Sequence, residues 1–346
     1  ENEKKITPLQ LLVKLNYNKY KGVLKNKKLD LGDTGSKILQ KSNKRWSNYI
    51  KKLPKKSMKG NRKVKPIKIQ MNKYSHGNIF QAKFTDCALY ANHLNKKFPQ
   101  LYIPKYIKGN LNNLTCDACL DVPDSMLEEY LNFPWLVIWN RQDNYWIHSY
   151  LNNLINSVRR EKKYDFVALF LSVKLKTGGL HASLILYDLK RNTVERFDPY
   201  GNTMLIDDGI DEIFEEELTW NTGLTYLKPS DFQPVSGFQT ISNENNIYNQ
   251  KVGDFGGYCL AWTCWYLEHR IMNSHVEPKI LIEKTIKKML KFKINFNEYI
   301  RNYANKLNEF RIKQLLKIGI PKNKISNEVL EYNYELMITN FIIKNM

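Results

Sequence analysis

Several features that would place this chain in a familiar class are scarce or absent. The 346 residues include five cysteines, an odd number at irregular spacing, which argues against the disulfide framework of a small secreted protein. No apolar run approaches the roughly 18–20 residues that a membrane-spanning helix needs, and the first residues lack a signal-peptide pattern. The Gly-rich stretch 253–257 lacks the Lys-Ser or Lys-Thr of a phosphate-binding loop. We therefore expect an intracellular protein in a reducing compartment, without a membrane span.

Acidic residues are also scarce at the beginning of the chain. Residues 1–74 hold 22 Lys or Arg and 4 Asp or Glu, a net charge of +18, whereas residues 75–346 carry a net charge of only +2. Such a basic segment is the electrostatic footprint of a nucleic-acid, anionic-membrane or acidic-protein contact. Binding of DNA or another polyanion by residues 1–74 is one expectation, and a simple solvated segment is the other.

What the chain does contain is a group of strand patterns in its middle. Residues 166–173 form a continuous apolar, β-favouring run, typical of a central buried strand. Residues 181–187 and 193–197 predict two more strands, joined by a polar turn at 188–192, and residues 224–227 suggest another. The short connections indicate a hairpin-linked sheet rather than a βαβ array.

Helical patterns dominate the last third of the sequence. Leu260, Cys264, Leu267 and Ile271 recur at the spacing of one helix face, which predicts a helix from Cys259 to about Met272. Further helices are predicted at 279–292 and 296–318, with a third starting at Ser326. These patterns predict an α+β fold in three parts: a basic segment at 1–74, a core at 75–275, and a C-terminal helical extension at 276–346.

Three short segments form a candidate catalytic site. His181 follows a Gly-Gly turn at the start of one predicted strand, and Asp198 follows the end of the next. In an antiparallel hairpin, the start of one strand lies beside the end of its partner, so Asp198 should reach the imidazole and fix its tautomer. Cys259 follows Gly256 and Gly257 at a predicted helix N-terminus, where the helix dipole favours a thiolate and an oxyanion can meet free backbone N–H groups.

Each of these residues also has a plain structural interpretation. A lone cysteine on an apolar helix is usually a small buried hydrophobe, which is the role expected for Cys264. The ordered combination of His181, Asp198 and Cys259 favours a Cys–His–Asp triad with nucleophile, base and base-orienting roles.

The order and context of these residues resemble the adenovirus-protease and SUMO-protease superfamily of cysteine peptidases. The segments 181–188, 195–201 and 257–262 look most like members encoded by large DNA viruses, and the resemblance covers the triad region, residues 165–275. It implies a papain-like or adenain-like core with the nucleophile at a helix N-terminus. It also implies a thiol protease acting on peptide or isopeptide bonds, either of viral precursors or of ubiquitin-like conjugates, in the cytoplasm, a virus factory or a virion.

The same family uses a glutamine before the cysteine to complete the oxyanion hole. Gln239 is the first candidate for that role because it follows a strand, and Gln250 is the alternative, nearer to Cys259. Neither lies at the usual short distance from the cysteine. Ala182 also stands where many relatives carry Trp, which affects the expected substrate preference.

Other readings of the chain remain open. Cys116 and Cys119 have the spacing of half a zinc site, but a second paired motif is missing, so neither a metal nor a cofactor is expected. An acyltransferase could use the same triad. A catalytically inactive fold that binds nucleic acid in a virion is the remaining alternative.

Overall fold

A computed structural model describes residues 84–107, 131–142, 144–175, 180–202, 209–242, 258–325 and 332–345. Several features singled out above lie outside these residues: the basic segment 1–74, Cys116 and Cys119, Gln250, and the glycines of 253–257. Contact of the basic segment with a polyanion therefore stays a prediction, as does the alternative oxyanion residue Gln250. The expectation that Cys116 and Cys119 hold no metal is not tested by the described residues.

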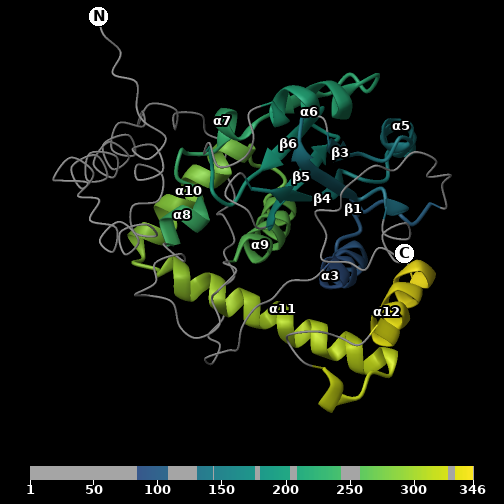
Figure 1. Ribbon diagram of the computed structural model, residues 1–346. Coiled ribbons are helices and arrows are strands. Elements are labelled where there is room, and N and C mark those ends of the chain that lie inside the picture. Colours follow the sequence, from purple (N-terminus) through teal and green to yellow (C-terminus); the bar gives the residue numbers. More distant parts are fainter. Residues whose placement is uncertain are drawn as a thin grey trace, which may run out of the picture.

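A mixed β-sheet forms the centre of the described part of the chain (Figure 1). Its strands lie in the order β3-β2-β4-β5-β6-β7, and β1 also pairs with β4. The strands are β1 (Leu101–Tyr102), β2 (Leu136–Arg141), β3 (Asn144–Trp146), β4 (Phe166–Lys174), β5 (Leu180–Asp188), β6 (Thr193–Phe197) and β7 (Thr225–Leu227).

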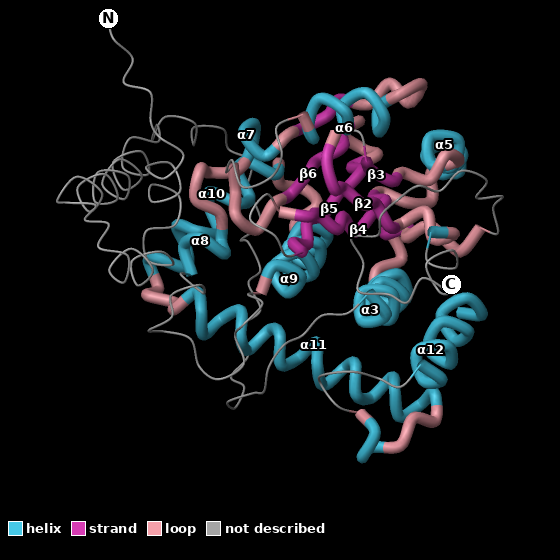
Figure 2. The backbone as a smooth tube through the Cα atoms, viewed as in Figure 1, coloured by secondary structure: helices cyan, strands magenta, loops and turns pink. Residues whose placement is uncertain are grey.

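Helices cover both faces of this sheet (Figure 2). On β5, the hydroxyl of Tyr187 reaches Leu218 of α6, while the next residue, Asp188, pairs with Arg270 of α9. Because successive strand residues point to opposite faces, α6 and α9 lie on opposite sides of the sheet. The helices are α3 (Phe84–Lys97), α5 (Leu151–Glu161), α6 (Ile210–Thr219), α7 (Pro229–Phe232), α8 (Phe238–Ser242), α9 (Cys259–Met272), α10 (Pro278–Lys291), α11 (Phe296–Ile318) and α12 (Tyr332–Asn345), with a 3₁₀ turn at Lys322–Lys324.

The strand pairing agrees with the predicted α+β class and refines the predicted sheet. Strands β4, β5 and β6 form an antiparallel meander, as the short turns indicated. The outer pairs β2–β4 and β6–β7 are parallel. The chain returns to these positions through α5 and α6, because parallel neighbours require a crossover connection. The sheet is therefore mixed, and its hairpin-linked part is the central one.

Helix α9 is more deeply buried than its single apolar stripe predicted. Every residue from Leu260 to Ile271 is buried, including the charged Glu268 and Arg270. The sheet covers one side of the helix, and α11 packs on another. A stripe of apolar residues predicts one buried face, whereas a helix in the middle of a layered domain must bury polar residues too and satisfy them with partners.

The C-terminal helices pack directly on the core. Tyr303 of α11 and Tyr90 of α3 both donate hydrogen bonds to the buried carboxylate of Glu268 in α9. Lys97 adds an ion pair to the same carboxylate at 2.7 Å. Helix α12 in turn packs against α3. Among the described helices, none combines the length and the apolar character needed to cross a lipid bilayer.

Candidate functional site

The β5–β6 hairpin brings His181 and Asp198 together. Pairing of the two strands ends at Leu184 and Phe197, so Asp198 is the first residue beyond β6 and lies beside the start of β5. Imidazole Nε2 of His181 is 2.9 Å from Oδ1 of Asp198, and both side chains are almost fully buried. The antiparallel geometry expected from the sequence places this pair within hydrogen-bonding distance.

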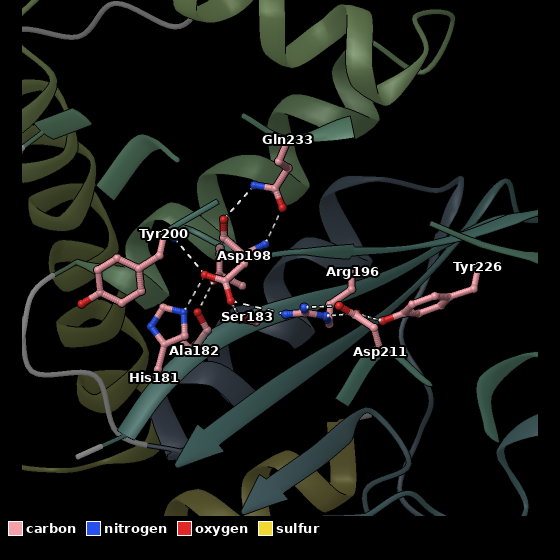
Figure 3. Close-up of polar contacts among 10 residues, drawn as sticks. His181, Ala182, Ser183, Arg196, Asp198, Tyr200, Asp211, Tyr226 and Gln233 are labelled. Carbon is pink, nitrogen blue, oxygen red and sulfur yellow. Dashed lines mark hydrogen bonds and ion pairs between the residues drawn. The ribbon is translucent and has the colours of Figure 1, made fainter. Parts of the chain in front are cut away.

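Four further groups hold Asp198 in place (Figure 3). The backbone N–H of Tyr200 donates to Oδ1 at 2.8 Å, and the hydroxyl of Ser183 donates to Oδ2 at 3.2 Å. The side-chain amide of Gln233 accepts from the Asp198 N–H at 2.8 Å and donates to its carbonyl at 2.7 Å. A guanidinium N–H of Arg196 lies 3.4 Å from Oδ2. Both the main chain and the carboxylate of Asp198 are therefore fixed, which is what orientation of the imidazole requires.

Cys259 lies near the same pair. It is the first residue of α9, and the hydroxyl of Thr263, one turn later, donates to the carbonyl of Ala182 on β5 at 3.2 Å. This contact holds the beginning of α9 against the beginning of β5. Cys259 is near enough to the His181 imidazole to raise its pKa. Since Nε2 is occupied by Asp198, Nδ1 is the nitrogen left for the sulfur.

The local charges favour a protonated imidazole. Burial alone lowers the pKa of His181, but the Asp198 carboxylate, the hydrogen bond to it and nearby Cys259 outweigh burial and raise that pKa to about 10. Burial likewise acts to raise the pKa of Asp198, whereas His181 and Arg196 lower it below its ordinary value. The ring of Tyr200 stacks on the imidazole with centroids 4.7 Å apart. The surroundings of His181 therefore favour its protonated form.

Gln239 lies close to this site through its backbone. Its N–H donates to the carbonyl of Pro199 at 2.9 Å, which places α8 against the turn that follows Asp198. Its side chain is buried, and neither Nε2 nor Oε1 has a hydrogen-bond partner in the described structure. Buried amides are normally paired, so this one is a candidate donor to a bound group. Its distance to the sulfur is not fixed by any contact, so the oxyanion role stays a prediction.

The other cysteines of the described chain lie elsewhere. Cys264 is buried inside α9, and burial first, then nearby Cys87 and Glu268, raise the pKa of its thiol. This matches the structural role expected for it. Cys87 lies half-buried on α3. No cluster of His, Cys, Asp or Glu suited to a metal ion occurs within the described ranges.

Sequence reasoning missed the residues that support Asp198. Ser183 and Tyr200 are close to the predicted pair in sequence, and strand alternation places Ser183 on the His181 face. Gln233, in contrast, lies 35 residues from its partner, and its spacing carries no signal. Arg196 was given no role from the sequence, although the same alternation puts it on the face of Asp198.

Comparisons with known proteins do not support the expected family. No protein-family model matches the chain, and no solved structure matches it. The chain is 26% identical over 296 residues to a protein of Acanthamoeba polyphaga mimivirus that is described as an ankyrin repeat protein. The match covers 81% of this chain and 38% of that relative, so the chain spans well under half of the relative's length.

These findings overturn the resemblance to the adenovirus-protease and SUMO-protease superfamily. Membership of that superfamily, thiol-protease hydrolysis of peptide or isopeptide bonds, and a deubiquitinase-like activity are wrong, because the relative is described as an ankyrin repeat protein. The physical reason for the error is that a Cys–His–Asp arrangement recurs on unrelated folds, so three short segments do not define a family. The viral character of the relative agrees with the predicted viral origin, and the papain-like description of the core stays a prediction.

Proposed function

We propose that the described domain is a thiol-dependent enzyme whose nucleophile is Cys259. The observation that supports this proposal is the position of the His181 imidazole, which lies near Cys259 and is hydrogen-bonded to the Asp198 carboxylate. A thiol next to an imidazolium is readily held as the thiolate, the nucleophilic form of cysteine. A purely structural cysteine inside a helix needs no buried imidazole beside it that is also hydrogen-bonded to a carboxylate.

Each residue would have a defined part in the reaction with an acyl ester such as p-nitrophenyl acetate. The Cys259 thiolate attacks the carbonyl carbon of an acyl donor, and the backbone N–H groups at the start of α9 face the oxygen that becomes negative. His181 gives its Nδ1 proton to the departing group and later takes a proton from the acceptor. Asp198 keeps the ring oriented and stabilises its positive charge throughout. The acyl group spends the interval as a thioester on Cys259.

Reactivity of the thiols tests this proposal directly. Iodoacetamide and p-nitrophenyl acetate should modify Cys259 much faster than Cys87, which is also half-buried but lies on α3. Cys264 should react last, because it is buried. Mass spectrometry of the labelled peptides gives each rate.

The matched variant is His181→Gln. It should slow modification of Cys259 by about 10²-fold or more, in the range of a lost general acid–base group, and leave Cys87 unchanged. Equal rates at Cys259 and Cys87 in the natural protein would refute the proposed function. So would a His181→Gln protein in which Cys259 reacts as fast as before.

Replacing Gln239 offers a second test, in which the acylation rate of Cys259 should fall while the free energy of unfolding rises. We propose that its unpaired amide donates to the oxyanion, so Gln239→Leu should slow acylation of Cys259 by about 10²–10³-fold. A buried amide without a partner costs about 1–3 kcal/mol, so the same change should raise the free energy of unfolding. Burst kinetics with p-nitrophenyl acetate and urea titrations measure the two effects. Loss of stability together with unchanged acylation would show that the amide is structural.

Protein binding is a second candidate function, favoured by the mimivirus relative. Stacked repeats of the ankyrin kind present extended surfaces that bind other proteins. The described part of this chain is a mixed sheet between helices rather than a stack of helix pairs, so the described residues do not form such repeats. The relative also supports a place of action in an infected cell. A full-length protein that binds partners, with a Cys259 no more reactive than Cys87, would favour this function over the enzyme.

A further inference from the structure

Behind Asp198, a chain of charged groups leads away from the site and ends at β7 (Figure 3). Arg196 is buried, and its guanidinium makes two hydrogen bonds to Asp211, from Nε at 2.7 Å and from the NH2 group at 2.9 Å. Its remaining nitrogen faces Oδ2 of Asp198 at 3.4 Å. The hydroxyl of Tyr226 donates to Asp211 at 2.8 Å. One cation thus lies between two carboxylates, one of which belongs to the candidate site.

This arrangement is built by three separate elements. Arg196 and Asp198 point to the same face because they are two residues apart along the extended end of β6. Asp211 lies in the first turn of α6, where the helix dipole favours its negative charge. Tyr226 comes from β7, the parallel neighbour of β6. The bidentate contact holds the planar guanidinium in one orientation, so its third nitrogen is directed at Asp198.

We propose that Arg196 is a positioning residue that fixes the Asp198 carboxylate and, balanced by Asp211, governs the charge state of the His181–Asp198 pair. This inference rests on the proposed function, since it assigns Arg196 a part in preparing that same pair. Arg196 acts on the imidazole through Asp198. Ser183 shares the second carboxylate oxygen with it, which leaves the first oxygen to His181 and Tyr200.

Charge balance predicts opposite effects for the two ends of the Arg196–Asp211 pair. The charged or titratable groups around the His181–Asp198 pair are Cys259 from α9, Arg196 from β6, Tyr200 from the turn after β6, Asp211 from α6 and Tyr226 from β7. Removing the Arg196 cation should raise the pKa of both Asp198 and His181, because the positive charge that disfavours proton binding at each group is gone. Removing the Asp211 anion leaves that cation uncompensated, so both pKa values should fall. If the contact were only structural, removing Arg196 and removing Asp211 would shift the two pKa values in the same direction.

NMR titration of the whole chain tests this without depending on enzyme activity. The His181 imidazole is followed in ¹⁵N-histidine protein and identified by its loss in His181→Gln, and the Asp198 carboxyl is followed by ¹³C. Asp211→Asn should move both titrations to lower pH by roughly one unit, and Arg196→Gln should move both to higher pH. Arg196→Lys should restore much of the natural titration, and Tyr226→Phe, which removes a neutral group, should change little.

The possible outcomes distinguish a failure of the role of Arg196 from a failure of the proposed function. Shifts of the same sign in Arg196→Gln and Asp211→Asn, or the absence of any shift, would overturn the role of Arg196. If Arg196→Gln does not fold, Asp211→Asn decides, because Asp211 is partly exposed; an unchanged or raised His181 titration in that variant overturns the role. If the titrations shift as expected but Cys259 is modified no faster than Cys87, the proposed function is overturned instead.

Discussion

Replacing Arg270 with leucine is expected to lower the free energy of unfolding by about 3–5 kcal/mol, because two buried carboxylates lose their shared cation. Arg270 is fully buried in α9. Its Nε lies 3.0 Å from Glu195 Oε1, and its NH2 group lies 2.7 Å from Asp188 Oδ2. A charge left in the interior without its partner keeps its desolvation cost and loses its compensation. Urea unfolding followed by circular dichroism measures the loss.

An exposed ion pair of the same length provides the control. Lys190 lies 2.7 Å from Asp165, but its side chain is 70% exposed. Water screens such a pair, so Lys190→Ala should cost less than about 1 kcal/mol. Adding Glu195→Gln to Arg270→Leu should recover part of the loss, because Glu195 is the carboxylate left without a cation, whereas Asp188 keeps Arg191 at 2.8 Å. Similar losses for Arg270→Leu and Lys190→Ala would contradict the role assigned to burial.

Arg270 also affects the candidate site, because it anchors the helix that carries Cys259. Thr263 attaches the beginning of α9 to Ala182 at the start of β5, and Arg270 attaches its end to Asp188 at the end of that strand. The helix and the strand therefore run side by side with a fixed register. Loosening of the far end should let the first turn shift relative to His181.

Gly237→Ala is expected to cost about 3 kcal/mol of stability, the upper end of typical overpacking costs, and to abolish the preferential reactivity of Cys259. A Cβ at position 237 would lie 2.3 Å from the backbone nitrogen of Gly201 and 2.4 Å from the carbonyl oxygen of Pro199. Those atoms are main chain, so the turn that follows Asp198 would have to move as a whole. Thermal or urea unfolding gives the first effect, and iodoacetamide labelling gives the second.

Gly223→Ala distinguishes this backbone contact from ordinary glycine strain. Gly223 has a φ of +64°, but a Cβ there would meet nothing within 4 Å. Alanine should therefore cost about 1–2 kcal/mol through its conformation alone, with Cys259 as reactive as before. If Gly237→Ala proved no worse than Gly223→Ala and left Cys259 labelling intact, the close approach of the two chain segments would not matter to the site.

The regular elements were largely predictable because their signals are local. The strand at 193–197 and the helices at 259–272 and 296–318 were predicted with the bounds that the structure shows. Apolar periodicity and the Gly319 stop determine such elements over a few turns. The predicted start of the last helix at Ser326 lies outside the described residues, so it stays a prediction.

The candidate site likewise has a part that was predictable from the local sequence and a part that was not. A hairpin is a local structure, so the sequence alone predicted that Asp198 would lie beside His181. Its motifs did not establish a family, because short motifs describe chemistry that many folds share.

By itself, then, the sequence determined the central meander, the helix that begins at Cys259 and the contact between an imidazole and a carboxylate across one turn. Only the tertiary structure decided that Gln233 and Arg196 hold that carboxylate, that α9 is buried on all sides, and that the turns at Gly201 and Gly237 interlock. Those contacts join segments whose separation along the chain carries no periodic signal. They arise from the closure of layers around the sheet, where each buried polar group must find whichever partner the packing brings near.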